Sequence, residues 1–174
     1  LISKANLFIN DAYLTDMNGG NITFIISRMD KKSRKYVSLS NQEKSWMETF
    51  NFENFEEIVR KGFYKFEEKV ISLSESSTIK VLGASTRGAL IIQMLELDSR
   101  FITTAVDLQK NKVGRRIPGT DIVIEFDGEH EVPDYYLVMP YQFRTEIIKR
   151  YLNYMKSGGG LLFYRPQQEI ITYD

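Results

Sequence analysis

The sequence around residue 80 reads Lys80-Val81-Leu82-Gly83-Ala84-Ser85-Thr86-Arg87-Gly88, and an apolar segment at 89–97 follows it. We expect a short strand, a glycine-containing turn and a helix, whose first amides lack intrahelical partners and carry partial positive charge. Gly83 and Gly88 keep the outer spacing of the dinucleotide fingerprint G-x-G-x-x-G, although Ser85 replaces its middle glycine. The turn is therefore predicted to bind an anion, and the alternative is a plain turn capped by Ser85 or Thr86.

The segment 101–106 is the next expected strand, and with the first strand and helix it completes a βαβ unit of the doubly wound kind. The apolar helix between them should lie buried against the sheet. Asp107 ends the second strand about 20 residues after Gly88, the position at which a Rossmann-type site holds a ribose hydroxyl. The alternative is a strand-end carboxylate that faces water.

A basic loop at 108–120 follows this strand and contains Lys110, Lys112, Arg115 and Arg116. These cations, beside the predicted anion-binding turn, could contact a diphosphate. The alternative is an ordinary solvated loop. A short apolar segment at 122–124 comes next, before an acidic loop.

The segment 134–139 is predicted to be a buried parallel strand that ends at Pro140. Tyr141, Gln142 and Phe143 then lie at its carboxyl end, where ligands bind in open α/β sheets. A helix at 144–156 and strands at 161–164 and 169–173 follow. The predicted fold is an α/β, Rossmann-like three-layer sandwich with a mostly parallel sheet, preceded by an N-terminal β-hairpin segment.

The N-terminal part is predicted to be separate. Two extended segments within 5–27 flank a turn at 18–21, and 29–35 has the character of a solvated linker. An amphipathic helix is expected at 51–73, since apolar residues recur there at three- and four-residue spacing. We therefore divide the chain into 1–35 and a Rossmann-like domain at 36–174.

The composition excludes several classes of protein. Lys plus Arg equals Asp plus Glu at 23 each among 174 residues, so no global field attracts nucleic acid or an anionic membrane. No apolar run approaches the ~20 residues that span a bilayer. With no cysteine and one histidine, His130, the chain is expected to hold no disulfide and no metal site. His130 is interpreted as a solvated loop residue.

Several separated blocks of residues resemble one family in order and spacing. The blocks are Gly83-Ala84-Ser85-Thr86-Arg87-Gly88, Ala105-Val106-Asp107, Lys112-Val113-Gly114-Arg115, Pro118-Gly119-Thr120, the run from Pro133 to Arg144, Glu146-Ile147 and Gly158-Gly159-Gly160. Together they resemble the C-terminal domain of S-adenosylmethionine-dependent sugar C-methyltransferases, which methylate a carbon of a nucleotide-linked deoxysugar. The resemblance covers residues 45 to 170.

The N-terminal segment Asn18-Gly19-Gly20-Asn21-Ile22-Thr23-Phe24 is similar to a family segment that closes the sheet of the preceding methyltransferase domain. Asn18 stands where histidine is usual, Arg87 replaces a usual lysine, and Tyr141 replaces a usual tryptophan. The resemblance implies that residues 1–35 are the terminal strands of that domain plus a linker. Because the sequence starts at Leu1, we expect a piece of a longer protein.

The resemblance implies a division of labour. S-adenosylmethionine, the zinc-binding domain and the acid/base pair would belong to upstream parts of the same polypeptide, so the chain alone is expected to be inactive, with no catalytic residue of its own. Its expected partner is a nucleotide sugar, and its expected location is the cytoplasm. The implied substrate-binding residues are Gly83, Ala84, Ser85, Thr86, Arg87, Gly88, Asp107, Lys112, Arg115, Pro140, Tyr141, Gln142 and Phe143.

Two other functions remain open from the sequence. One is an NAD(P)- or nucleotide-binding module of an oxidoreductase, which the fingerprint spacing and Asp107 suggest. The middle Ser85 and the lack of an evident hydride-site histidine weigh against it. The other is a non-catalytic interaction domain in which the turn is only structural.

Overall fold

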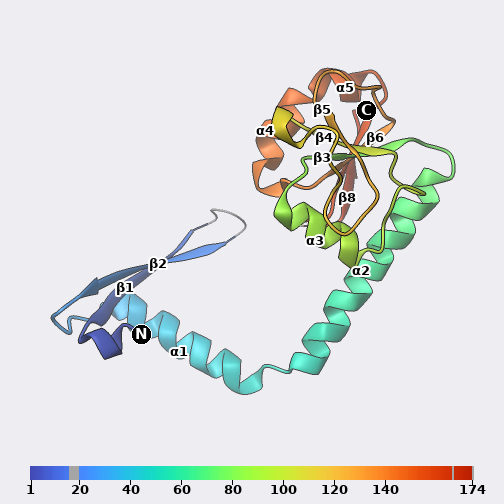
Figure 1. Cartoon of the computed structure of the whole chain (residues 1–174). Coiled ribbons are helices and arrows are strands. Elements are labelled where there is room, and N and C mark those ends of the chain that lie inside the picture. The colour runs from blue at the N-terminus through green and yellow to red at the C-terminus, as the bar shows by residue number, and fades with distance from the viewer. Residues whose placement is uncertain (16–19, 166, 174) are drawn as a thin grey trace. The chain divides into compact units, whose positions relative to one another are not determined.

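The computed structural model describes residues 1–15, 20–165 and 167–173. The chain forms two compact units, Leu1–Glu56 and Glu57–Asp174. The helix α2 (Phe52–Ser74) crosses this boundary and matches the amphipathic helix expected at 51–73 (Figure 1). The boundary lies later than the division at residue 35, because the intervening helix packs with the hairpin.

The first unit contains a 3-10 turn at Ser3–Ala5, an antiparallel hairpin of β1 (Phe8–Thr15) and β2 (Asn21–Ser27), and α1 (Arg34–Thr49). The expected hairpin is confirmed, although its turn residues 18 and 19 lie outside the described residues. Helix α1 occupies a region to which the sequence analysis assigned no element. Ser33 begins this helix, since its Oγ accepts from the Tyr36 amide and donates to the Asp11 carboxylate of β1.

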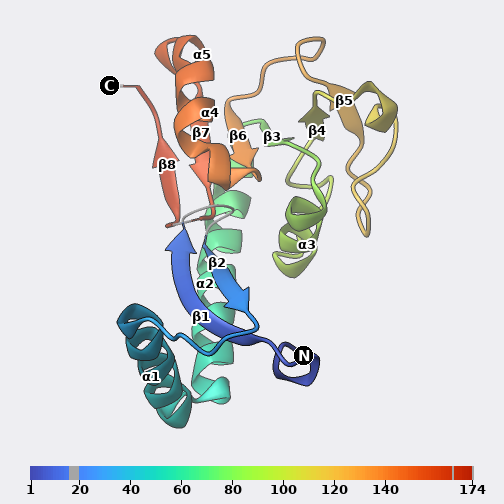
Figure 2. The ribbon, with the colours of Figure 1, turned by 90° about the vertical axis from the view of Figure 1, so that its left-hand side faces the viewer.

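The second unit is built on a six-stranded sheet. Its strands are β3 (Ile79–Leu82), β4 (Thr104–Asp107), β5 (Ile124–Phe126), β6 (Tyr135–Val138), β7 (Gly160–Phe163) and β8 (Glu169–Ile171). They lie in the order β5-β4-β3-β6-β7-β8, which can be followed across Figure 2. All neighbours pair in parallel except β8, which is antiparallel to β7. The predicted mostly parallel α/β sheet is confirmed.

Helices cover both faces of this sheet. Phe66 and Val70 of α2 share one apolar core with α3 (Thr86–Met94) and the inward residues of β3 and β4. The opposite face carries α4 (Arg144–Arg150) and α5 (Leu152–Lys156), with Ile147 and Met155 in a second core. Strand residues alternate between the two cores, as the pleat requires. The three-layer arrangement follows.

Three details of the sequence-based prediction are wrong. Strand β4 starts at Thr104 rather than 101, because Asp98 accepts the amides of Phe101 and Ile102 in a turn. Helix α3 ends at Met94 rather than near 97, although Ala89 and Ile92 pack it against the sheet as expected. The helix expected at 144–156 is two helices that meet at Tyr151.

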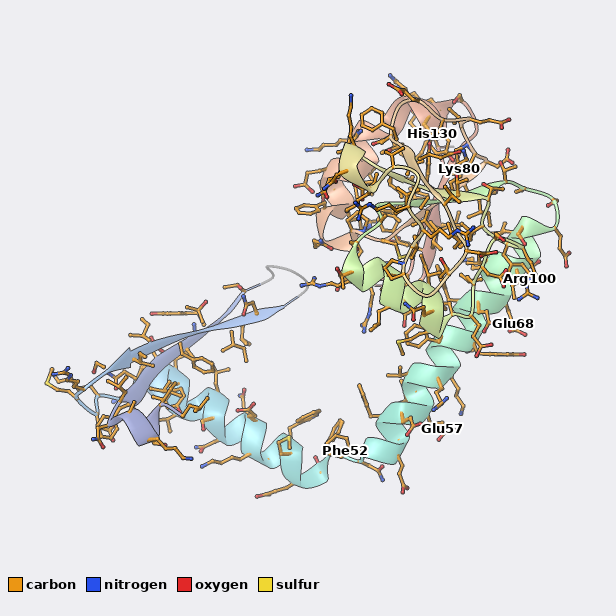
Figure 3. All side chains as sticks on the ribbon, in the orientation of Figure 1. Phe52, Glu57, Glu68, Lys80, Arg100 and His130 are labelled. Atoms are coloured by element: carbon orange, nitrogen blue, oxygen red, sulfur yellow. The ribbon has the colours of Figure 1, made fainter. Side chains whose placement is uncertain are left out.

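Polar residues inside the sheet unit are paired. Lys80 of β3, labelled in Figure 3, is 6% exposed. Its Nζ donates to Glu125 Oε2 at 2.7 Å. His130, which was expected to be a solvated loop residue, is half-buried, with its Nε2 2.6 Å from the hydroxyl of Tyr136. Tyr136 is buried, which together with the charges of Asp127 and Glu125 raises its pKa to about 12. The isolated-loop interpretation of His130 is therefore wrong.

Candidate functional site

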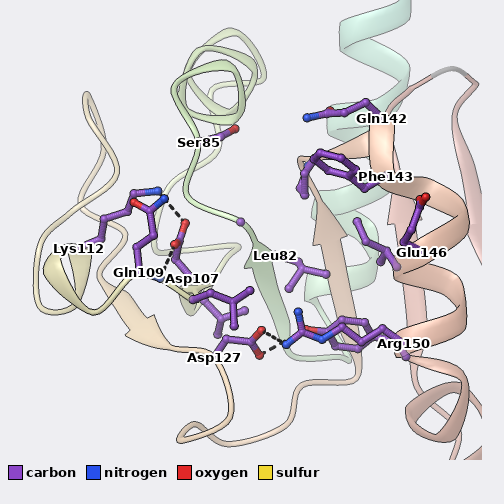
Figure 4. Close-up of a pocket in the computed structure, with 16 residues that line it drawn as sticks. Leu82, Ser85, Asp107, Gln109, Lys112, Asp127, Gln142, Phe143, Glu146 and Arg150 are labelled. Atoms are coloured by element: carbon purple, nitrogen blue, oxygen red, sulfur yellow. Dashed lines mark hydrogen bonds and ion pairs between the residues drawn. The ribbon is translucent and has the colours of Figure 1, made fainter. Parts of the chain in front are cut away.

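A cavity of about 500 Å³ opens at the carboxyl ends of the parallel strands (Figure 4). It lies where β3 and β6 are neighbours, and where the connections turn to opposite sides of the sheet. Open α/β sheets bind ligands at this topological switch point. We call it the larger cavity, to distinguish it from a smaller cavity of about 440 Å³ beside the same turn. It is lined by Leu82, Gly83, Ser85, Val106, Asp107, Leu108, Gln109, Lys112, Asp127, Pro140, Gln142, Phe143, Glu146, Ile147, Arg150 and Tyr151.

Gly83 makes the turn between β3 and α3 possible. Its φ is +88°, and a Cβ built there would lie 2.9 Å from Cδ of Pro140. Its amide donates to the carbonyl of Val106 at 2.8 Å, which ties the turn to the neighbouring strand β4. A residue with a side chain would be strained in this conformation and would also press on Pro140. The sequence therefore places the turn correctly, and its tight form depends on glycine.

Ser85 caps helix α3, because its Oγ accepts from the amide of Gly88 at 3.1 Å. Within the described part of the chain, the amides of Thr86 and Arg87 have no hydrogen-bond partner. Gly88 has a packing role, since a Cβ there would lie 2.7 Å from Cγ of Met139. The capping alternative thus describes the geometry well, and two first-turn amides remain available to an anion.

Asp107 braces the turn. Its Oδ2 accepts from the Ala84 amide and from Lys112 Nζ, each at 2.9 Å, and its Oδ1 accepts from the Gln109 amide at 2.8 Å. Lys112 Nζ also donates to the Ala84 carbonyl at 3.0 Å. A carboxylate offers about four acceptor positions, so three are already used. Asp107 therefore fits neither alternative simply: it is not a carboxylate facing water, and little of it remains for a ribose.

Asp127, Arg150 and Tyr151 form a polar corner of the larger cavity that the sequence analysis missed. The Asp127 side chain is 9% exposed and accepts from Arg150 Nη2 at 2.6 Å, with the Tyr151 hydroxyl at 3.4 Å. Burial, reinforced by the charge of Asp127, raises the pKa of Tyr151. The available signal was the place of Asp127 three residues after the apolar segment at 122–124, directly after strand β5.

The floor of the larger cavity is apolar. Leu82, Val106 and Ile147 form it from the second core, and Phe143 stands at its edge, 54% exposed. Carboxylates outnumber cations around it, with Asp107, Asp127 and Glu146 against Lys112 and Arg150. Both of these cations are already paired with aspartates. The larger cavity thus suits an uncharged, hydroxylated or planar group.

A second cavity of about 440 Å³ flanks the same turn. We call it the cation-lined cavity. Its lining shares Ser85 and Lys112 with the larger cavity and adds Ala84, Thr86, Ala89, Leu90, Gln93, Arg115, Arg116, Ile117, Pro118 and Ile124.

The structure distributes the residues implied by the resemblance between these cavities. The larger cavity is lined by Gly83, Asp107, Pro140, Gln142 and Phe143, and the cation-lined cavity by Ala84, Thr86 and Arg115. Ser85 and Lys112 line both. Arg87, Gly88 and Tyr141 line neither: Arg87 is exposed, Gly88 is buried and Tyr141 packs on the second core.

The described residues contain no cluster of His, Cys, Asp and Glu side chains suited to hold a metal ion. Among them, no helix is both long and apolar enough to cross a membrane.

Comparison with known proteins adds two similarities. A family model described as the C-methyltransferase C-terminal domain matches residues 16–166. The C-methyltransferase NovU of Streptomyces niveus is 28% identical over 103 residues, which make up 58% of this chain and 24% of that protein. The match therefore spans about a quarter of the relative's length.

Proposed function

From the premise that this chain belongs to the C-methyltransferase C-terminal domain family, we propose that it is the substrate-side domain of an S-adenosylmethionine-dependent C-methyltransferase. In this proposal it binds and orients a nucleotide-linked deoxysugar. The domain contributes the position of the substrate, and other parts of the polypeptide carry out the transfer.

The observation that carries the proposal is the larger cavity at the switch point of the sheet. Its volume of about 500 Å³ lies in the range of small-molecule sites, and it combines an apolar floor with a polar rim, as such sites do. Gln109 and Gln142 offer amide groups, and the aspartates are held in place by their own partners. Preorganised polar groups of this kind fix the orientation of a sugar or base.

Orientation is the catalytic contribution that this chain can make. A reacting carbon held against its partner groups reacts far faster than one that diffuses freely, because the loss of translational and rotational freedom has already occurred. S-adenosylmethionine supplies the methyl group when bound, and we assign its site to a preceding methyltransferase domain. We assign no residue of this chain to the donor or to proton transfer.

We propose that the hairpin β1–β2 is the end of that preceding domain. The hairpin leaves several apolar side chains exposed on β2, among them Ile22, Phe24 and Ile26, which alternate along one face. A contiguous exposed apolar face is typical of a surface that another part of a protein covers. The upstream methyltransferase domain is the proposed cover, with the zinc-binding domain as a further partner in the same polypeptide.

A thermal-shift panel tests the proposal. The chain is melted with nucleoside-diphosphate-linked deoxysugars, with NAD and with S-adenosylmethionine, because a ligand that binds only the folded state raises the melting temperature. We expect a saturable rise with the nucleotide sugars alone. A rise with NAD alone would favour an oxidoreductase module, and no rise with any of them would favour an interaction domain.

A single substitution connects that rise to the larger cavity. Phe143→Ala removes the exposed ring at the cavity edge, and loss of one ring–base stack weakens binding by about 1–3 kcal/mol. We expect the shift caused by the nucleotide sugar to fall strongly, with the melting temperature of the free protein nearly unchanged. Phe52→Ala is the matched control, since Phe52 is 71% exposed and lines neither cavity.

A further inference from the structure

The two cavities that flank the β3–α3 turn differ in charge. The cation-lined cavity contains Lys112, Arg115 and Arg116 and no carboxylate in its lining. The larger cavity contains three carboxylates and two cations. The formal charge of the lining is therefore positive on one side of the turn and negative on the other.

The cations of the larger cavity are already committed. Arg150 pairs with Asp127 at 2.6 Å and Lys112 pairs with Asp107 at 2.9 Å, whereas Glu146 is exposed. A phosphate group placed there would face like charges and would compete with existing ion pairs. Like charges brought together without solvent are unfavourable. The larger cavity thus disfavours an anion.

Two of the three cations that line the other cavity, Arg115 and Arg116, are not engaged in ion pairs among the described residues. Lys112 uses two of its three Nζ hydrogens, on Asp107 and on the Ala84 carbonyl, so one remains. Guanidinium groups match phosphate oxygens with two parallel hydrogen bonds each.

The backbone that carries these arginines is fixed by the fold. The Ile124 amide donates to the Arg115 carbonyl at 2.8 Å, the Gly114 amide donates to the Ile124 carbonyl at 2.9 Å, and Arg116 bridges to Val123. Ile117 next to them is buried in the first core. The backbone of this segment is therefore ordered, while the side chains of Arg115 and Arg116 are exposed to solvent.

A contact to helix α3 holds the loop at one side of the cavity. Gln93 Nε2 donates to the Pro118 carbonyl at 2.8 Å, and Gly119 lies directly on the Gln93 side chain. The loop is therefore held against the helix on the far side of the arginines. Binding an anion between such fixed elements requires little ordering of the backbone.

We infer that the cation-lined cavity binds the diphosphate of the ligand, and that the uncharged ring system lies in the larger cavity. This inference rests on the proposed function for the identity of the ligand, but its evidence is the separation of charge across the turn. Ser85 and Lys112, which line both cavities, would then mark the point where the ligand passes from one to the other.

Calorimetric titration with inorganic pyrophosphate tests the inference, because this probe carries the charge without any ring. In the Arg115→Gln/Arg116→Gln protein we expect binding to weaken by roughly tenfold for each arginine, the size of a lost charge-assisted hydrogen bond. The control Arg100→Gln/Lys149→Gln also removes two positive charges from the same unit, but at residues that line neither cavity. It should change the affinity by about twofold or less, since solvent screens distant charges.

Glu146→Gln supplies the opposite test. If the diphosphate occupied the larger cavity, removal of this carboxylate would strengthen pyrophosphate binding, whereas our inference predicts no change. The inference is overturned if the wild-type chain does not bind pyrophosphate, if the double arginine variant binds it normally, or if Glu146→Gln binds it more tightly. The proposed function is judged separately, by the shift that nucleotide sugars produce in the thermal panel.

Discussion

Gly83 shows how one residue sets the shape of the candidate site. Its positive φ turns the chain from β3 into α3, and its missing Cβ admits the ring of Pro140, which ends the neighbouring strand β6. The two strand ends on either side of the switch point therefore meet at this glycine. Glycine is therefore required at this position for two reasons: the backbone has a positive φ, and a side chain would clash with Pro140.

Substitution separates these two requirements. Gly83→Ala should lower the free energy of unfolding by about 2–3 kcal/mol, the sum of a left-handed backbone penalty of about 1–2 kcal/mol and a steric contribution. Gly114→Ala is the control, because Gly114 has a φ of +78° but open space around a built Cβ. Urea unfolding of both variants gives the comparison. Equal losses would show that Pro140 exerts no steric constraint.

Asp107 shows what sequence spacing can and cannot predict. Its place at the end of a strand, about 20 residues after Gly88, follows from the spacing of the βαβ unit. Its partners do not, because Lys112 and the Ala84 amide reach it only after the loop and the turn have folded. A residue's position in a motif is local information, whereas its hydrogen bonds depend on tertiary structure.

At the scale of elements, one group of three hydrogen-bonded polar side chains joins three strands. Lys80 of β3 donates to Glu125 of β5 across β4, and Thr104 of β4 donates to the same oxygen at 2.8 Å. Burial alone raises the pKa of Glu125, but the hydrogen bonds from Lys80 and Thr104 outweigh it, and the pKa lies below its usual value. The ionised form of Glu125 is therefore favoured in the folded state.

This group makes stability depend on pH. Because the folded pKa of Glu125 is lowered, its contribution is present above the unfolded pKa and is lost as the pH falls through the folded pKa. Glu125→Gln should cost about 2 kcal/mol at pH 7, less than a fully buried pair since the Glu125 side chain is 35% exposed. The cost should shrink as the pH falls through the folded pKa of Glu125, because the wild type then becomes protonated as well.

The control is the exposed pair Lys61–Glu57 on α2. Glu57→Gln should change the free energy of unfolding by less than about 0.5 kcal/mol at either pH, as expected of a surface ion pair. Urea unfolding at pH 7 and pH 3 measures both variants. A loss at Glu125→Gln that is independent of pH would show that packing, and not charge, joins the strands.

The elements differ in how far the sequence predicts them. The central strands and α2 have strong apolar patterns, and their positions are confirmed within a few residues. Helix α1 was missed because an amphipathic helix is recognised from the apolar residues that it buries. Among its described residues, α1 buries none. The split at Tyr151 was missed because residues on both sides share one apolar face.

At the scale of the molecule, burial is distributed unequally between the two units. Among the described residues, Ala12 is the buried hydrophobic residue of the first unit, whereas the second holds both apolar cores. Apolar burial is the main favourable contribution to folding. The cooperative stability of the chain should therefore belong to the second unit.

Truncation tests this distribution. A chain of residues 51–174 keeps Asn51, whose side chain accepts from the Asn54 amide at the start of α2. We expect its melting curve, followed by circular dichroism, to stay cooperative with a midpoint close to that of residues 1–174. A broad or strongly lowered transition would show that the first unit stabilises the sheet.

We also expect no turnover by this chain alone. Residues 1–174 alone should transfer no methyl group from S-adenosylmethionine to a nucleotide-linked keto-deoxysugar, because orientation accelerates a reaction only where the reacting groups are present. Incubation with methyl-labelled donor measures this. Label in the sugar product would contradict the assigned division between binding and chemistry.

We propose that the carboxyl ends of β3, β4 and β6 hold a nucleotide sugar. An amide nuclear magnetic resonance titration of the 15N-labelled chain with a nucleoside-diphosphate-linked deoxysugar tests it most directly. We expect saturable shifts at residues 82–88, 106–116 and 141–147, and unchanged signals in β1, β2 and α1. Saturable shifts confined to the hairpin, or none at millimolar ligand, would contradict it.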